Sequence, residues 1–213
     1  MPVSDCEVRD PRIRRTRQSL QGALGRLLLE KNFDEISVQD ITEAAAVNRA
    51  TFYDHYTDKF ALLDAMVAGG FHKLLSEREI QYDGSCPSAA RAVVMATCDY
   101  LTQCESQRTR NQQQAAVEPL IDAAIVQTIR RVLMRGAKGA HLLPEAGSLS
   151  ADILTTSASW AIYGAVKTWA SAPQRPPAEE IVALVVKLAF PMLLEASGRN
   201  PPSSAVAPAA AHA

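Results

Sequence analysis

The sequence predicts an all-α protein, and three observations lead to this fold class. Apolar residues recur at helical spacing between residues 11 and 197, and no run alternates with a period of two for long enough to form a β-strand. Proline and glycine residues fall at the boundaries of these periodic segments. The chain has 213 residues, 47% hydrophobic and 21% charged, so it has enough apolar material for one or two globular units.

The first helix is predicted to begin at Pro11, because proline suits the first helical position and Asp10 is a good N-cap. Asn32 is predicted to end this helix in a left-handed turn. The apolar residues of the helix recur at helical spacing and are expected to form one buried stripe: Ile13, Leu20, Leu24, Leu27 and Leu28.

Two short helices are predicted next, with only Ala46 to Asn48 between them. Ser37 caps the first and has Asp40 three residues later as a capping-box partner, while Asn48 caps the second. This spacing is typical of a helix-turn-helix. The apolar residue before each cap can pack on the turn that follows, which pairs Ile36 with Ile41 and Val47 with Phe52.

Capping residues, prolines and glycines set the boundaries of the later helices. The helices after the first are predicted at about 38–45, 49–56, 58–81, 87–107, 117–137, 150–171 and 177–196. Thr57 is the predicted N-cap of the fourth helix, and Pro191 is expected to kink the last one because it removes a backbone hydrogen bond. The buried face of the fourth helix is expected to contain Phe60, Leu63, Val67, Phe71 and Leu74.

Charge and composition exclude several classes of protein. Lys and Arg total 22 against 23 Asp and Glu, so the chain lacks the positive excess of a protein that coats nucleic acid. No apolar run is long enough to cross a membrane, and the N-terminus lacks the apolar segment of a secretory signal. We therefore expect a cytoplasmic protein with no membrane partner.

The residue types that usually bind metals or catalyse reactions are not grouped in the sequence. The cysteines form no C-x-x-C pair, so no metal or other cofactor is expected; they are Cys6, Cys86, Cys98 and Cys104. We expect free thiols that pack as small apolar residues, with a redox switch as the alternative. The four histidines lack the partners of a catalytic site, so no enzymatic activity is expected.

A basic cluster opens the first helix and consists of Arg12, Arg14, Arg15 and Arg17. By itself such a cluster is typical of a solvated helix face, but its place directly before a helix-turn-helix favours contact with DNA phosphates. Residues 1–72 contain 9 Lys and Arg against 11 Asp and Glu, so any attraction to DNA has to be local. Further contributions are expected from Arg49, Lys59 and the N–H groups at helix N-termini.

The third helix has one face suited to a DNA groove. Phe52 and Tyr56 lie one turn apart and point inward with Val47, so Ala50 and Asp54 point outward. A small residue such as Ala50 lets the helix enter a major groove about 12 Å wide. The flanks carry side chains that can contact phosphates or bases, namely Thr51, Tyr53 and His55, with Lys59 reaching the DNA backbone from the next helix.

The run ISVQDITEAAAVNRATFYDHYTDKFALL resembles the DNA-binding signature of the TetR (tetracycline-repressor-like) family of bacterial transcriptional regulators. The resemblance covers about residues 12–70, and TFYDHYTDK is its most diagnostic part. It implies an all-helical homodimer with a three-helix DNA-binding domain, a linking fourth helix and a larger helical ligand-binding domain. Ala46 stands where the family commonly has glycine, and a positive φ at alanine would cost about 1 kcal/mol.

Carried over by position, the resemblance assigns DNA contacts to two groups of residues. The first group is the start of the first motif helix, which is Ser37, Val38 and Gln39. The second group is Thr51, Tyr53, His55 and Lys59. The reasoning from the residues themselves adds Arg14, Arg49 and Ala50.

The expected domain organisation has four segments. They are a flexible N-terminus at 1–10, a helix-turn-helix DNA-binding domain at 11–57, a ligand-binding and dimerisation domain at 58–197 whose linking helix is 58–81, and a disordered tail at 198–213. The tail is rich in proline, alanine and serine, which is typical of disorder.

The segment 153–172 contains a single charge, Lys167, and is apolar on several faces. A helix of this kind is expected to pack both against its own domain and against a second chain. Together with the last helix it would form half of a four-helix bundle across a two-fold axis, with a monomer as the alternative. The expected interface residues are Trp160, Gly164, Trp169, Val185 and Leu188.

The middle helices, at 87–134, are expected to enclose a pocket for an effector. Candidate wall residues, each of which is also a normal core residue, are Met95, Cys98, Tyr100, Met134 and Trp160. No cluster of charges is evident there, which favours an apolar or aromatic small molecule.

These observations predict a sequence-specific DNA-binding transcriptional regulator. We expect a homodimeric repressor that reads a palindromic double-stranded DNA operator and is released by a small-molecule effector. An activator or global regulator on the same scaffold is the first alternative, and a helical-bundle enzyme is the second.

Overall fold

The computed structural model describes residues 10–77, 87–108, 117–139 and 149–195. These residues form eight α-helices and one short 3-10 helix and contain no strand, which confirms the all-α prediction. The elements are α1 (Pro11–Glu30), η2 (Phe33–Glu35), α2 (Val38–Ala45), α3 (Arg49–His55), α4 (Lys59–Glu77), α5 (Pro87–Arg108), α6 (Glu118–Gly139), α7 (Leu149–Ala170) and α8 (Ala178–Glu195). The expected flexible N-terminus and disordered tail lie almost entirely outside the described residues.

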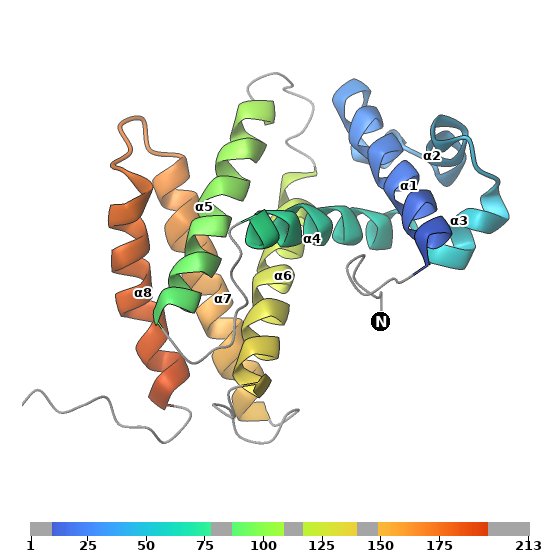
Figure 1. Ribbon diagram of the computed structural model, residues 1–213. Coiled ribbons are helices and arrows are strands. Elements are labelled where there is room, and N and C mark those ends of the chain that lie inside the picture. Colours follow the sequence, from blue (N-terminus) through green and yellow to red (C-terminus); the bar gives the residue numbers. More distant parts are fainter. Residues whose placement is uncertain (1–9, 78–86, 109–116, 140–148, 196–213) are drawn as a thin grey trace, which may run out of the picture.

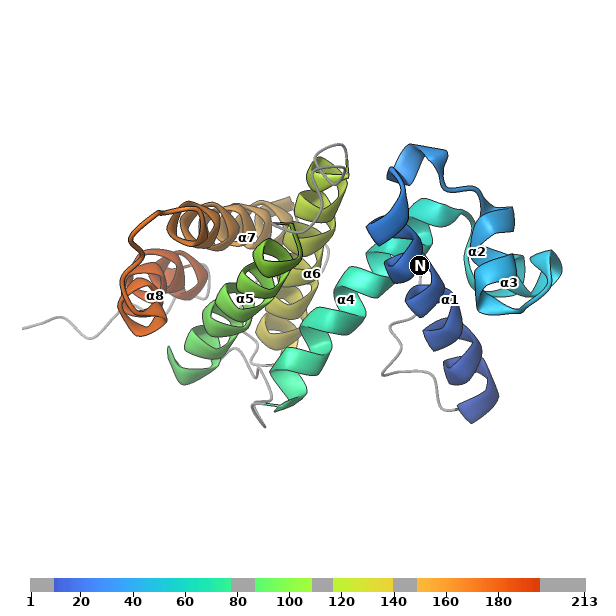
Figure 2. The same ribbon diagram turned by 90° about the horizontal axis from the view of Figure 1, so that it is seen from above.

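The helices are arranged in two groups joined by α4 (Figure 1). In one group α1 packs against α2 and α2 against α3, while in the other α5, α6, α7 and α8 form a bundle. The helix α4 extends from the first group into the bundle, where it packs on α5 and α6 (Figure 2). The helices α7 and α8 lie at the end of the molecule remote from α3 (Figures 1 and 2).

Each group has its own hydrophobic core, and α4 contributes to both. Its first turns place Leu62 and Leu63 in the core of the N-terminal group, together with Leu24, Ile41 and Phe52. Its later turns supply the core of the bundle with buried residues, namely Val67, Phe71 and Leu75. The expected division between residues 57 and 58 therefore falls just before a helix that both cores share.

The local signals in α2 and α3 are confirmed. The Ser37 hydroxyl accepts from the Asp40 N–H at 3.1 Å and the Asp40 carboxylate accepts from the Ser37 N–H at 2.7 Å, which completes a capping box. The Asn48 side chain caps α3 by accepting from the Thr51 N–H at 2.7 Å. Ala46 ends α2 in the left-handed conformation with a φ of 55°.

Two predicted helix ends are wrong. The helix α1 ends at Glu30, and Asn32 has an extended backbone rather than a left-handed one. The Asn32 N–H instead donates to the Glu35 carboxylate at 3.3 Å and begins η2. The α4 helix is capped by Asp58 and not by Thr57, because the Asp58 carboxylate accepts from the Ala61 N–H at 2.8 Å.

Two residues of the predicted apolar stripes are exposed, namely Ile13 on α1 and Phe60 on α4. The remaining stripe residues are buried or partly buried in the two cores. The helix α8 continues through Pro191, and the expected kink there stays a prediction.

The described part of the chain contains two of the four cysteines. Cys98 is buried and Cys104 is half-buried, and neither forms a disulfide. Over the same residues no helix has the length and apolar character needed to cross a membrane.

Candidate nucleic-acid interface and effector cavity

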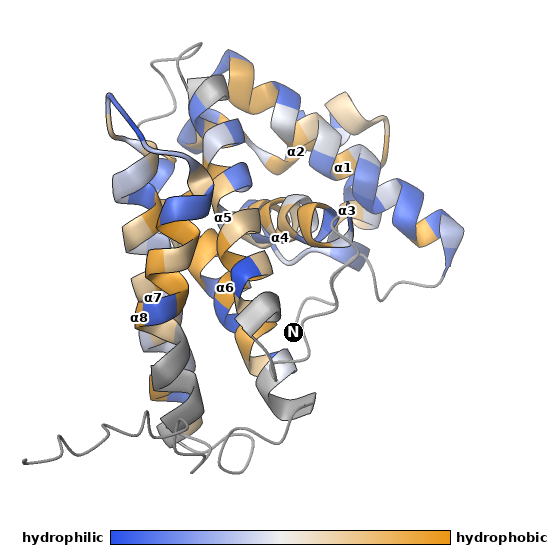
Figure 3. Ribbon diagram, turned by 60° about the vertical axis from the view of Figure 1, so that its left-hand side comes forward, coloured by the Kyte–Doolittle hydropathy of each residue, from blue (hydrophilic) through white to orange (hydrophobic). Residues whose placement is uncertain are grey.

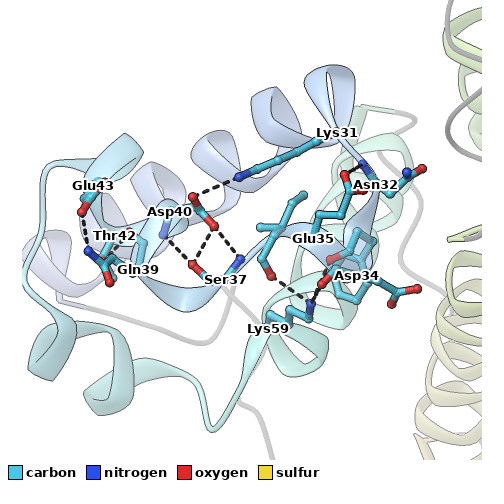
Figure 4. Close-up of polar contacts among 12 residues, drawn as sticks. Lys31, Asn32, Asp34, Glu35, Ser37, Gln39, Asp40, Thr42, Glu43 and Lys59 are labelled. Atoms are coloured by element: carbon cyan, nitrogen blue, oxygen red, sulfur yellow. Dashed lines mark hydrogen bonds and ion pairs between the residues drawn. The ribbon is translucent and has the colours of Figure 1, made fainter.

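The start of α2 is fixed by a network around Asp40 (Figure 4). Besides the capping box, the Asp40 carboxylate accepts from the Ser37 hydroxyl at 2.6 Å and pairs with the Lys31 ammonium at 2.9 Å. The hydrogen bonds from Ser37, followed by the nearby Lys31, hold the pKa of the Asp40 carboxyl well below its usual range. This network joins the end of α1 to the first turn of α2 at the molecular surface.

The inner face of α3 is anchored in the domain core by buried aromatic residues. Phe52 is fully buried and Tyr56 almost so, and their rings pack with centroids 6.0 Å apart. The Tyr56 hydroxyl accepts from the Gln21 side-chain amide at 3.2 Å, which ties the end of α3 to α1. As predicted, Tyr56 is a core residue.

The opposite face of α3 is exposed. Arg49, Ala50, Tyr53 and Asp54 lie on it, while Thr51 and His55 are half-buried at its flanks. The Arg49 guanidinium lies over the Tyr53 ring, 5.7 Å from its centroid, and donates to the Tyr53 hydroxyl at 3.3 Å. The exposed face of α3 thus presents a small central residue beside a cation stacked on an aromatic ring.

The basic cluster of α1 is smaller than the sequence indicates. Arg12, Arg14 and Arg15 are exposed. Arg17 is only 5% exposed and its guanidinium lies 5.1 Å from the centroid of the Tyr56 ring, so it packs inside the domain. Figure 3 shows the hydrophilic residues that gather at the N-terminal end of α1.

The predicted role of Lys59 does not fit its position (Figure 4). The Lys59 ammonium donates to the backbone carbonyls of Phe33, Asp34 and Ile36, at 2.8, 3.1 and 2.8 Å. These bonds use all three N–H groups of the ammonium, so the side chain holds η2 and the turn before α2 rather than reaching outward. The sequence shows no sign of this, because the carbonyls lie more than twenty residues away along the chain.

The other candidate residues at the start of α2 differ in their exposure. Ser37 and Gln39 are exposed, and the Gln39 amide donates to Glu43 at 2.9 Å. Val38 is partly buried against the N-terminal core. The N–H groups in the first turn of a helix have no intrahelical acceptor. In α2, α3 and α4 some of them are bound by capping side chains, and the others can donate to a ligand. Such groups suit phosphate oxygens.

A cavity of about 290 Å³ lies where the two groups of helices meet. Its wall includes Gly25 and Leu28 of α1, Met66 of α4, Tyr100 of α5 and Ile125 of α6. Of the five residues that the sequence suggested as pocket walls, Tyr100 is the one that lines this cavity. Residues of the N-terminal group thus form part of its wall, which sequence reasoning did not anticipate.

The other four suggested wall residues lie elsewhere. Cys98 is buried in the core of the bundle and Met95 packs against that core. Met134 is half-buried outside the cavity wall, and Trp160 is 55% exposed at the surface. Periodicity identifies buried positions on a helix, but it does not separate cavity walls from close-packed core, because both are apolar.

The cavity has a charged end, contrary to the expectation that no charges cluster there. Lys167 of α7 donates to Asp122 and pairs with Glu118 at 3.0 Å, and all three residues line the cavity. These contacts raise the pKa of Lys167 although burial lowers it, so the ammonium stays charged. The missed signal was Lys167 itself, since a single charge in an otherwise apolar helix needs a partner.

The outer surface of α7 and α8 carries exposed apolar side chains. Trp160 and Leu188, two of the expected interface residues, are 55% and 61% exposed, and Gly164 is exposed with open space around it. Ile153 and Leu184 are also exposed and were not anticipated. We call this surface the α7/α8 face, made of Ile153, Trp160, Gly164, Leu184 and Leu188.

Two expected interface residues do not lie on the α7/α8 face. Val185 is buried in the core of its own chain and is unavailable to a second chain. Trp169 packs within its own chain, where its indole N–H donates to the Pro176 carbonyl at 2.8 Å and the Arg175 guanidinium lies over its ring. On α8 Leu184 is exposed and its neighbour Val185 is buried. The sequence alone did not show which of these two apolar residues faces outward.

Comparisons with known proteins match the N-terminal group of helices. A model of the family described as bacterial regulatory proteins, tetR family, matches residues 23–66. The chain is 46% identical over 59 residues to an uncharacterized HTH-type transcriptional regulator, YxbF, of Bacillus subtilis (strain 168). That match covers 27% of this chain and 16% of the relative, so the chain spans a small part of the relative's length.

Over most of its length the chain also has the fold of a solved regulator. A TetR-family regulator from Streptomyces coelicolor A3 has a TM-score of 0.56 at 18% identity, covering 87% of this chain and 98% of that one. A TetR transcriptional regulator from Streptococcus agalactiae 2603V has a TM-score of 0.44 at 20% identity, covering 86% and 98%. The helix-turn-helix of this chain therefore matches the tetR family of bacterial regulatory proteins over residues 23–66.

Proposed function

We propose that the chain is a sequence-specific, DNA-binding transcriptional regulator that works as a homodimer in the cytoplasm. The observation that carries the proposal is the exposed face of α3, where Ala50 leaves room for a groove and Arg49 and Tyr53 stand beside it. This face belongs to a helix whose other side is fixed by Phe52 and Tyr56, so its orientation is rigid. A rigid helix with a small central residue suits the DNA major groove.

Each candidate residue has a role in this proposal. Thr51, Tyr53 and His55 contact phosphates or base edges from α3, with Arg49 as a partner of Tyr53. Ala50 lets α3 approach the floor of the groove. Ser37, Val38 and Gln39 lie at the start of α2 and hold the DNA backbone, and Arg14 reaches phosphate from α1. Lys59 contributes its backbone N–H at the start of α4, since its side chain is engaged elsewhere.

The α7/α8 face is the proposed dimer interface. Exposed large apolar side chains gathered on one surface are unusual for a monomer, and here they occupy two adjacent helices. Gly164 permits close approach of a second helix, because nothing lies within 4 Å of the place its Cβ would take. A two-fold dimer would present two copies of α3 to successive major grooves about 34–36 Å apart.

The cavity is the proposed effector site. Its wall contains residues of α1 and α4, so an occupant would contact the helices that carry the helix-turn-helix. A ligand that binds one arrangement of these helices more tightly than another shifts the population between them. We propose that this shift releases the operator, which makes the protein a repressor. The activator remains the alternative on the same scaffold.

The test is selection of DNA from a random duplex library, followed by fluorescence anisotropy. We expect enrichment of a palindrome bound by two chains, with affinity that falls steeply with salt because each neutralised phosphate releases counterions. A scrambled duplex of the same composition is the control. Failure to enrich any sequence, or equal binding to the scrambled duplex, would contradict the proposal.

A further inference from the structure

The charged end of the cavity has more acceptor capacity than its own residues use. Lys167 supplies one ammonium to two carboxylates, Asp122 and Glu118. One oxygen of Asp122 accepts from Lys167, while its other oxygen has the Tyr163 hydroxyl nearby but no well-aligned donor among the described residues. A half-buried carboxylate with an unused oxygen on a cavity wall favours a ligand that brings a hydrogen-bond donor.

A second polar group at the same end lacks a well-aligned partner. Tyr163 lines the cavity and is only 3% exposed, and its hydroxyl lies beside Asp122 and Lys167 without a hydrogen bond of good geometry among the described residues. Burial and, next, the neighbouring Asp122 carboxylate raise the pKa of Tyr163, so the phenol remains protonated. Buried hydroxyls almost always have a partner, so this one marks a place where a bound molecule can supply it.

The rest of the wall is suited to a cation with an apolar body. Two tyrosine rings, Tyr100 and Tyr163, line the cavity, and aromatic faces attract organic cations. The apolar wall is made by aliphatic side chains such as Leu28, Met66 and Ile125. An anion would have to compete with both carboxylates for Lys167, whereas a cation gains an additional contact with Asp122.

We propose that the cavity binds a small organic amine, protonated at neutral pH, whose nitrogen donates to Asp122 while its apolar or aromatic body packs against Leu28 and Met66. This inference rests on the proposed function, because it names the chemical class of the effector. Leu28 and Leu24 both lie on α1, and Leu24 packs in the N-terminal core with residues of α2 and α3. A bound amine therefore touches the helix that positions the helix-turn-helix.

The test uses three probes of nearly equal size and different charge: 4-phenylbutylamine, 4-phenylbutanol and 4-phenylbutanoate. Binding to the full chain is measured by calorimetry without DNA. We expect the amine to bind at least tenfold more tightly than the alcohol and the carboxylate to bind weakest. Equal binding of amine and alcohol, tighter binding of the carboxylate, or no binding of any probe would overturn the proposal.

Two variants locate the effect. Asp122→Asn should abolish the preference for the amine, and Lys167 keeps Glu118 as a partner, so the chain should still fold. Asp152→Asn is the matched control, because it breaks another ion pair between α6 and α7, with Arg130 at 2.8 Å, outside the cavity wall. An amine preference that survives in Asp122→Asn, or disappears equally in both variants, would overturn the assignment.

The two proposals fail separately. Selection of an operator depends on α3 and dimerisation, and it is measured without any probe. A chain that enriches a palindrome but does not prefer the amine would contradict the effector class alone. A chain that prefers the amine and enriches no palindrome would contradict the proposed DNA-binding function alone.

Discussion

The ammonium of Lys59, at the start of α4, lies 2.8 Å from the backbone carbonyl oxygen of Ile36, two residues before α2. The same ammonium donates to two carbonyls of η2 and lies 4.7 Å from the centroid of the Phe33 ring. These contacts fix the distance between the beginning of α4 and the beginning of α2. Lys59 is therefore a residue of the domain's framework, although it lies in the segment most typical of the family's DNA-binding motif.

Replacing Lys59 by methionine should destabilise the N-terminal domain. The change keeps the aliphatic stem and leaves the three carbonyls without their donor, which should lower the free energy of unfolding by about 1–3 kcal/mol. Urea denaturation followed by circular dichroism measures the change. Lys73→Met on α4 is the control. The Lys73 ammonium is mostly exposed and forms a long ion pair of 3.8 Å with Glu77, so this substitution should alter stability little. Equal effects of the two substitutions would contradict the framework role.

Ala46→Gly should stabilise the protein. Ala46 is exposed and has a φ of 55°, a conformation in which glycine avoids the steric cost of a Cβ atom. We expect the free energy of unfolding to rise by about 0.5–1 kcal/mol, measured by thermal or urea denaturation. Ala44→Gly, two residues earlier and inside α2, should have the opposite sign because glycine lowers helix propensity. A loss of stability in Ala46→Gly would show that the turn does not strain alanine.

Asp40 should make stability dependent on acid pH. Hydrogen bonds from Ser37 and the charge of Lys31 lower the pKa of Asp40 in the folded chain below the unfolded value of about 3.9. Its contribution is therefore complete above about pH 4 and is lost as the pH falls toward the folded pKa. We expect Asp40→Asn to be less stable than the unmodified chain at pH 6, with the difference shrinking below about pH 4.

The check on Asp40 is a series of urea denaturation curves between pH 3 and pH 6. Asp54→Asn, on the exposed face of α3, is the control for the removal of one negative charge. A difference between Asp40→Asn and the unmodified chain that stays constant over the whole series would contradict the assignment.

Tyr53→Ala should weaken operator binding and leave folding intact. Tyr53 is 49% exposed and contacts the core only through a ring contact with Phe52, besides its contacts with Arg49, so its removal costs little stability. We expect at least a tenfold loss of affinity for the selected operator, about 1.4 kcal/mol, measured by anisotropy. Tyr53→Phe keeps the ring and removes the hydroxyl, so it separates stacking from hydrogen bonding. Unchanged affinity in Tyr53→Ala would remove this residue from the interface.

Gly164→Leu should hinder dimerisation. A Cβ at this position meets no atom of its own chain within 4 Å, so the fold should accept the larger side chain, whereas a closely packed partner helix should not. Sedimentation velocity measures the fraction of dimer, and operator affinity should fall with it. Gln127→Leu, at another exposed position, on α6, is the control. An unaltered dimer fraction in Gly164→Leu would contradict the α7/α8 face as the interface.

Much of the helix-turn-helix could be predicted from the sequence because its signals are local. Ser37 with Asp40 and Asn48 with Thr51 interact across three residues, so the sequence places each pair before any tertiary contact forms. The two wrong helix ends have the same cause, since an equally good local alternative was present. Asn32 has Glu35 three residues later, and Thr57 stands beside Asp58, which is also a preferred N-cap.

The sequence by itself determined the all-helical fold, the boundaries of α2 and the start of α3, because caps and apolar periodicity act over a few residues. Only the tertiary structure decided which groups the long charged side chains contact. Arg17 lies under Tyr56, Lys59 on the carbonyls before α2, and Lys167 between Glu118 and Asp122 at the cavity. Their partners come from other helices, and a flexible cationic side chain selects among distant acceptors only after the helices have packed.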